Sequence, residues 1–180
     1  VVNPFLYDKL PYNPDTDLAP VSLLGTAPFA LFVSTTGGVN SFGDLLARVK
    51  ANAGKTNAGT ATQGSLLHLT LELLRRDTGM DFTYVPYKGV APALNAVLAG
   101  EVQLMFIPPT SAVQHIQSGR VRALAYTGKT RWSVLPDVPT VAESGLPGFS
   151  KDAGWNLWAA PAKTPMAIVS RLQKEAHKAL

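Results

Sequence analysis

The chain has 180 residues, of which 46% are hydrophobic and 16% charged, and its formal net charge at pH 7 is +4. This composition is typical of a globular protein and excludes a disordered chain. No apolar run approaches the roughly 20 residues of a membrane span. The absence of cysteine excludes disulfides, thiolate zinc sites and cysteine nucleophiles. Because the 16 Lys and Arg residues are scattered, we expect no nucleic-acid partner.

The beginning of the chain, Val1 to Pro4, contains neither methionine nor the basic and apolar regions of a signal peptide. We therefore expect that a leader has been removed or that the chain is a piece of a longer protein. Residues 1–17 are rich in Pro, Asn and Asp, and are expected to form an irregular lead-in or hinge segment.

Apolar, β-branched and aromatic residues predict strands at 18–24 and 28–34. A sequence like a capping box begins at Ser41 and predicts a helix that ends near Gly54. From there strands and helices alternate. Strands are expected at 56–59, 82–85, 102–107 and 121–127, and helices at 65–78, 91–99 and 111–118. A glycine follows each of the three helices. These repeated units predict an α/β fold with a mostly parallel sheet flanked by helices on both faces.

The pattern becomes irregular and proline-rich after residue 127. A short helix is expected at 140–144, a strand at 155–159 and an amphipathic helix at 166–180. The last two elements are expected to belong to another layer or another domain.

Motifs of catalysis are missing from the sequence. Gly59 and Gly64 have the spacing of a P-loop, but Ser65-Leu66 replaces the required Lys-Ser/Thr pair. There is no dinucleotide fingerprint and no nucleophile elbow, and the three histidines lie on three predicted helices without metal-ligand spacing. We therefore expect no enzyme, no cofactor and no metal site.

Two turns at the carboxyl ends of predicted strands have the composition of an anion site. In "GTATQGSLLH", Thr60, Thr62 and Ser65 supply hydroxyls and Gly64 allows close backbone approach; "YKG" at 87–89 combines an aromatic ring, a cation and a glycine. Ligands of open α/β sheets bind at this edge, where helix N-termini present free N–H groups. Together the turns would suit a carboxylate.

Simpler interpretations of the same residues stay open. Thr60 and Ser65 could cap a helix, and Lys88 could be a solvated loop lysine. His68, beside leucines in the first helical turn, could be structural, and Tyr87 could belong to the core.

Five stretches carry a family resemblance: "LPYNPDTDLAPVSLL", "GTATQGSLLHL", "VPYKGVAPALNAVLAGEVQLMF", "SGRVRALAYTGKTR" and "LPDVPTVAESGLPGF". In this order, over essentially the whole chain, they resemble the solute-binding receptors of tripartite tricarboxylate transporters, also called Bug-type proteins. The resemblance implies a periplasmic protein, whose signal peptide is not in this chain. It also implies two α/β lobes that close over a small carboxylate and present it to a membrane permease.

The resemblance also implies positions for the ligand loops. The first loop, S-A-G-x-G-S in the family, has Thr62 and Gln63 here in place of the usual glycine and asparagine, and His68 matches the histidine that follows it. The residues that match the two loops are Thr60, Ala61, Gly64 and Ser65 in the first and Tyr87, Lys88 and Gly89 in the second.

The family's first lobe begins with a segment that has no counterpart in this chain. We therefore expect residues 18–150 to form the second, ligand-binding lobe, and residues 151–180 to form a crossover strand and helix of a first lobe that is otherwise missing. Because apolar residues such as Trp155, Trp158 and Ile168 would then lack partners, the fragment is expected to self-associate or to swap these elements with another chain.

Ile107 marks a departure from the family, whose receptors often have aspartate at this position. If Ile107 lines the ligand crevice, a ligand ammonium beside it would lose water without gaining a partner. We therefore expect a carboxylate without an amino group. The alternative is that Ile107 extends the hydrophobic strand and does not meet the ligand.

The function that these observations favour is that of a carboxylate-binding receptor lobe without catalytic activity. One alternative is an α/β hydrolytic domain that uses Ser65 and His68, although no acid is evident to orient the histidine. Another is an interaction module that binds no ligand and only docks a permease.

Overall fold

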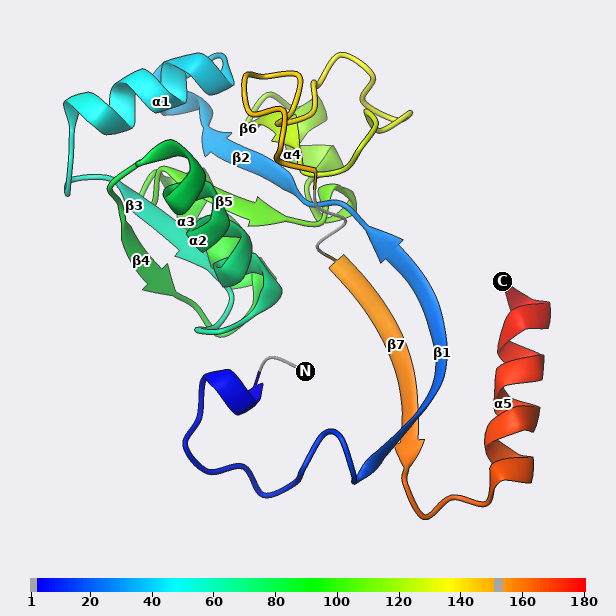
Figure 1. Ribbon diagram of the computed structural model, residues 1–180. Coiled ribbons are helices and arrows are strands. Elements are labelled where there is room, and N and C mark those ends of the chain that lie inside the picture. The colour runs from blue at the N-terminus through cyan, green and yellow to red at the C-terminus, as the bar shows by residue number, and fades with distance from the viewer. Residues whose placement is uncertain (1–2, 151–153) are drawn as a thin grey trace. The chain divides into compact units, whose positions relative to one another are not determined.

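The computed structural model describes residues 3–150 and 154–180, which divide into two compact units (Figure 1). Unit 1 combines Val1–Thr26 with Trp155–Leu180, and unit 2 is Ala27–Gly154. The structure therefore groups residues 18–26 with the C-terminal segment, whereas the sequence placed them with the lobe at 18–150. The assignment of the units to lobes of a longer receptor stays a prediction.

Unit 2 is built on a five-stranded sheet with the order β4-β3-β5-β2-β6. Its strands are β2 (Ala30–Ser34), β3 (Asn57–Thr60), β4 (Thr83–Pro86), β5 (Leu104–Ile107) and β6 (Val121–Tyr126). β3 pairs in parallel with β4 and β5, whereas β2 is antiparallel to both β5 and β6. Four strands therefore share one direction, as predicted, and β2 runs against them. An apolar run fixes neither the direction nor the neighbours of its strand, so this reversal was not predicted.

Helices flank this sheet, and the predicted caps at Ser41, Gly79 and Gly100 are formed. They are α1 (Phe42–Ala51), α2 (Leu66–Thr78), α3 (Val90–Ala99) and the short α4 (Val113–Gln117). The capping box at Ser41 is formed, because its hydroxyl accepts the N–H of Asp44 at 3.1 Å and its own N–H donates to the Asp44 carboxylate at 3.0 Å. α2 and α3 pack against β3 and β5, and α4 against β6, which encloses one continuous apolar core.

The expected helix at 111–118 is shorter in the structure. A 3₁₀ turn at Pro109–Ser111 precedes α4, and Ala112, whose φ of −124° lies outside the helical range, separates the two. Within the described residues, no helix is both long enough and apolar enough to cross a membrane.

The expected helix at 140–144 is wrong: these residues form one hydrogen-bonded turn. Its start is built like a helix, since Thr140 N–H donates to the Glu143 carboxylate at 2.7 Å and Glu143 N–H donates to the Thr140 hydroxyl at 3.1 Å. The turn stops at Gly145, whose φ of 112° leaves the helical region. Thr140 also forms a parallel bridge with Tyr126 at the end of β6, which holds the turn against the sheet.

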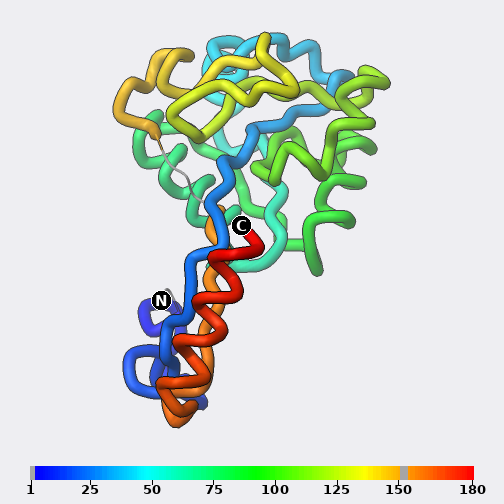
Figure 2. The backbone as a smooth tube through the Cα atoms, turned by 90° about the vertical axis from the view of Figure 1, so that its right-hand side faces the viewer, coloured from blue at the N-terminus to red at the C-terminus, as the bar shows by residue number. Residues whose placement is uncertain are grey.

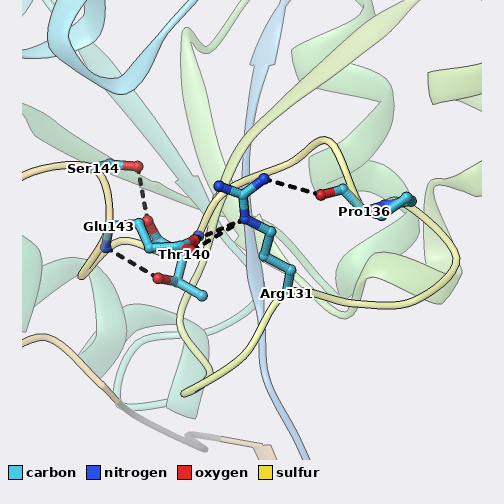
Figure 3. A network of polar contacts seen from close by, with 5 residues as sticks. All are labelled: Arg131, Pro136, Thr140, Glu143 and Ser144. Carbon is cyan, nitrogen blue, oxygen red and sulfur yellow. Dashed lines mark hydrogen bonds and ion pairs between the residues drawn. The ribbon is translucent and has the colours of Figure 1, made fainter.

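Glu143 joins this turn to the preceding loop. Figure 3 shows its carboxylate between Thr140 and the guanidinium of Arg131, whose Nε lies 3.0 Å from Oε2. Arg131 also donates to the carbonyl of Pro136 at 3.2 Å. The N–H of Thr140 is the main cause that lowers the pKa of Glu143 below its ordinary value of 4.5, and Arg131 adds to the effect.

Unit 1 contains a two-stranded sheet of β1 (Leu18–Ala27) and β7 (Gly154–Pro161), which run in opposite directions (Figure 1). The helix α5 (Met166–Ala179) lies beside them (Figure 2), and Val21, Ala160 and Val169 form a small buried cluster. Several large apolar side chains are exposed, as the sequence predicts: Trp155 (38%), Trp158 (49%), Ile168 (50%) and Leu172 (41%). Self-association through these residues stays a prediction.

The substitution Glu143→Gln tests the acid sensitivity of the turn. Because the folded state lowers the pKa of Glu143, its stabilising effect is full above 4.5 and is lost as the pH falls through the lower folded-state value. We expect the variant to melt below the wild type at neutral pH and the difference to shrink when the pH is lowered to about 3. Thermal melts measured over this range check the expectation.

Glu175→Gln is the matched control, because Glu175 is also exposed and bonds a cation, Lys178, but receives no main-chain N–H among the bonds described. Its melting curve should follow the wild type at every pH. Parallel pH curves for Glu143→Gln and the wild type would contradict the assignment.

Candidate functional site

The parallel pairing of β3 with β4 brings the two predicted loops together. Thr60 lies opposite Pro86 in the register, and the N–H of Tyr87 donates to the carbonyl of Thr60 at 2.8 Å. Gly89 N–H then donates to the carbonyl of Ala61 at 3.4 Å. Residues 61–65 (loop A) and 87–89 (loop B) therefore lie side by side at the carboxyl ends of the parallel strands.

Loop A is a tight turn that caps α2. Gly64 has a φ of 75°, a conformation that favours glycine, and Ser65 is the N-cap residue of α2. The Ser65 hydroxyl accepts the main-chain N–H of His68 at 3.3 Å, so the capping role is confirmed. The N–H of Ser65 donates to the carbonyl of Thr62 at 3.1 Å, and the N–H of Gly64 donates to Nδ1 of His68 at 3.1 Å.

These bonds change which N–H groups are free to bind an anion. The N–H groups of Gly64, Ser65 and Gly89, which lie in the two predicted loops, each already donate to a protein acceptor. Within residues 3–150 and 154–180, the N–H groups of Leu66 and Leu67 have no such acceptor. They belong to the first turn of α2, where the chain offers no helical partner and the helix dipole is positive.

Burial separates the predicted site residues into two groups. Thr60 is 1% exposed, and its hydroxyl has no hydrogen-bond partner among the described residues. Ala61 is also buried, whereas Gly64 and Ser65 are half-buried at the loop surface. The hydroxyl of Thr60 therefore points into the protein rather than toward solvent.

The exposed polar side chains at the tip of loop A are those of Thr62 and Gln63. Gln63 was not among the sequence-based candidates. The signal that could have found it is its position midway between the last residue of β3 and the N-cap of α2, where a chain that has left the sheet is open to solvent.

Loop B supplies the charge of the site. Lys88 is exposed and is the only charged residue in the two loops, neither of which contains an acidic residue. Gly89 has a φ of 123° and is the N-cap of α3 without a side-chain cap. Tyr87 is half-buried; burial is the main cause that raises its pKa above the ordinary value of 10.0. Lys88 is therefore the one charge within the loops, and the carboxylate of Glu101 outside them contributes to the raised pKa of Tyr87.

Ile107 lies at the same edge of the sheet but not on its surface. It ends β5, pairs with Ala30 of β2 and is 0% exposed. The structure thus places its side chain in the core and does not bring it together with the exposed residues of loops A and B. An aspartate at this position would be a buried carboxylate without an evident partner, which is costly.

His68 belongs to a polar cluster beside loop A. Its Nε2 lies 3.8 Å from Oε1 of Glu72, and Glu72 forms an ion pair with Arg75 at 2.9 Å. Its ring and that of Tyr84 in β4 pack in a T-shaped arrangement with 4.7 Å between the ring centroids, and the guanidinium of Arg75 lies over the same tyrosine. Burial, with a contribution from Glu72, raises the pKa of Tyr84 above its usual range.

Glu72 was missed by the sequence analysis, although its spacing of four residues from His68 on a helix was a usable signal. The cluster nevertheless does not form a hydrolytic site. Ser65 bonds the main chain of His68, while the ring nitrogens face Gly64 and Glu72. In the described part of the chain, no metal-binding group of three His, Asp or Glu residues is found either.

A cavity of about 180 Å³ lies at the end of the sheet that is opposite to loops A and B. Most of its polar side chains have protein partners: Ser34 bonds Thr36, Arg48 donates to the carbonyl of Gly37, and Gln103 bonds Asn57 and Gly100. These bonds close the ends of β2, β3 and β5. The cavity therefore reflects the packing of the sheet ends and is not the candidate site.

The family model described as "Tripartite tricarboxylate transporter family receptor" matches residues 1–180. This match covers the whole chain. The chain belongs to the tripartite tricarboxylate transporter receptor family.

Relatives of this receptor family agree with the match. A protein of the tcbD-tcbE intergenic region of Pseudomonas sp. strain P51 is 39% identical over 181 residues, which cover 100% of this chain and 54% of that protein. The R. palustris structure with adipate has 34% identity and a TM-score of 0.88, and covers 94% of this chain and 56% of that one. MatC from Rhodopseudomonas palustris with bound malate has 35% identity and a TM-score of 0.86. The match covers 97% of this chain and 59% of the MatC chain.

The chain spans about half the length of the curated relatives that it matches. The fold class predicted from the sequence, an α/β lobe like those of periplasmic binding proteins, is confirmed by these structures.

The substitution Ser65→Ala tests the cap of loop A in this receptor-family chain. Loss of the hydroxyl leaves the N–H of His68 without its acceptor, and we expect the free energy of unfolding to fall by about 1 kcal/mol. Ser65→Asn retains a good N-cap residue and should stay near the wild type. Urea unfolding of the three proteins measures the difference, and an Ala variant as stable as wild type would contradict the cap.

Proposed function

We propose that this chain is the lobe of an extracytoplasmic solute-binding receptor that captures a small carboxylate. The observation that carries the proposal is the pair of loops joined by the bonds from Tyr87 to Thr60 and from Gly89 to Ala61. The pair presents one cation, free N–H groups at the start of α2 and no acidic side chain. A carboxylate there gains charge-assisted hydrogen bonds, whereas a ligand cation would be repelled by Lys88 and by the positive end of the α2 dipole.

Four groups are assigned to the ligand. The N–H groups of Leu66 and Leu67 bind one carboxylate oxygen each, and the Ser65 hydroxyl, which accepts from His68, is free to donate its own hydrogen. Lys88 balances the charge from loop B. Gly64 and Gly89 keep the backbone without side chains where the ligand approaches, while Thr60, Ala61 and Ile107 support the loops from below.

The ligand is proposed to be a carboxylate without an amino group. The solved relatives include one with adipate and one with bound malate, both dicarboxylates that lack an amine. In this chain neither loop contains an acidic residue that could pair with an ammonium. The buried end of β5 supplies no such residue either, since Ile107 and two prolines stand there.

The receptor is further proposed to act in the periplasm and to deliver its ligand to a membrane permease. The family model is that of a transporter receptor, and one solved relative is described as a periplasmic transporter. A second lobe, from the part of the relatives' length that this chain does not span, would complete the cage around the ligand. The proposed role is therefore binding and delivery without turnover.

Calorimetric titration of the complete receptor tests the ligand class. We expect malate or adipate to bind, and glutamate and aspartate to bind at least about tenfold more weakly, because a desolvated ammonium finds no partner. Lys88→Gln should weaken dicarboxylate binding several-fold, whereas Lys55→Gln, which removes an exposed lysine from the opposite edge of the sheet, should not. Tighter binding of the amino acids would contradict the proposal.

A second test places the carboxylate at the start of α2. Ser65→Asp and Ser65→Asn both keep an N-cap residue, and they differ by one negative charge. If the ligand carboxylate sits there, Ser65→Asp should bind dicarboxylates at least about tenfold more weakly than Ser65→Asn. Equal affinities at equal stability would move the anion site away from loop A.

A further inference from the structure

His68 contacts both parts of the candidate site. Its ring Nδ1 accepts the N–H of Gly64 at 3.1 Å, and its main-chain N–H donates to the hydroxyl of Ser65 at 3.3 Å. The same ring packs on Tyr84 in β4, the strand that leads into loop B. One side chain therefore joins the turn of loop A to the strand that carries loop B.

The bond from Gly64 fixes the protonation of the ring. A nitrogen that accepts an N–H has no proton of its own, so the neutral ring carries its proton on Nε2. Nε2 faces the carboxylate of Glu72 at 3.8 Å, and this charge favours a proton at that position. Geometry on both sides of the ring thus selects one tautomer.

We propose that His68 is the positioning residue of the ligand loop, and that its second protonation releases Gly64 and weakens ligand binding. The proposal rests on the carboxylate-binding function proposed above. With Nδ1 as acceptor, the turn at Gly64 is held so that the N–H groups of Leu66 and Leu67 face the ligand unbonded. A doubly protonated ring has no acceptor, and its Nδ1–H would face the Gly64 N–H.

The charged and titratable groups around the ring come from two elements. On α2, Glu72 lies 3.8 Å from Nε2 and is itself paired with Arg75. On β4, Tyr84 packs against the ring and stays neutral, because its pKa is raised above the usual range. The ring is therefore held between the N–H of Gly64 on one side and the Glu72–Arg75 pair on the other.

The sign of the pH effect separates positioning from direct contact. Histidine side chains take up a second proton between about pH 8 and pH 5. If His68 positions loop A, carboxylate affinity falls as the pH is lowered through this range. If its ring instead contacted the ligand as a cation, affinity would rise.

Two amide substitutions provide a matched pair for the test. The Asn side chain in His68→Asn places its oxygen near the position of Nδ1 and does not titrate, whereas the longer Gln in His68→Gln places its oxygen near Nε2. We expect His68→Asn to bind malate within about threefold of the wild type at pH 8, and His68→Gln about tenfold more weakly.

The experiment is calorimetric titration of malate into the complete receptor between about pH 8 and pH 6. The wild-type affinity should fall relative to that of His68→Asn, which corrects for the titration of malate itself. Parallel pH profiles for these two proteins, a rise for the wild type, or equal affinities of the Asn and Gln variants would each overturn the proposal.

Nitrogen NMR of the histidine rings makes the test independent of the ligand. At pH 8 the His68 ring should carry its proton on Nε2 with Nδ1 unprotonated, and a proton on Nδ1 would overturn the proposal. If the wild type binds no carboxylate at any pH, the proposed function fails together with the ligand part of this inference, while the NMR result still decides whether His68 holds loop A.

Discussion

The register in which β3 pairs with β4 is the constraint on which the candidate site depends. Thr60 lies opposite Pro86, so the two strands end level and their loops begin at the same height. On its other side β3 packs closely against the segment that leads into β5, because a Cβ at Gly59 would lie 3.0 Å from Cγ2 of Val102. The bond from the N–H of Tyr87 to the carbonyl of Thr60 continues the β3–β4 ladder into the loops. The meeting of loops A and B is therefore a consequence of strand pairing.

The same packing explains why the site is made mainly of backbone and of a few exposed side chains. β3 lies between β4 and β5, and β5 is buried along its whole length. Side chains near the strand ends, such as Thr60 and Ile107, are thus enclosed before the loops begin. In the proposed site, recognition would fall to the residues beyond the sheet, where the N-terminus of α2 offers donors and Lys88 a positive charge. Selectivity would then depend on the absence of an acidic residue from the two loops as much as on the residues present.

Local signals in the sequence predicted the elements and the two loops. The capping box at Ser41, the cap at Ser65 and the glycine after α2 each depend on neighbouring residues and are all formed. The direction of β2, the burial of Thr60 and the use of the Gly64 N–H by His68 were not predicted, and the burial of Ile107 was one of two alternatives left open. Each is set by contacts between segments or by the orientation of a side chain, which composition and spacing do not encode. At Thr140 a local signal was instead given too much weight. The residues have the bonds of a helix start, but Gly145 ends the turn before a helix can form.

The single cation of the loops has a consequence for the speed of capture. Its field and those of the neighbouring helix ends extend only about 8 Å in physiological salt, which is little more than the first layers of water. A carboxylate would therefore reach the loops by ordinary diffusion, with weak electrostatic guidance at a distance. Ligands of equal charge would then arrive at similar rates, and the receptor would distinguish them by how long each one stays.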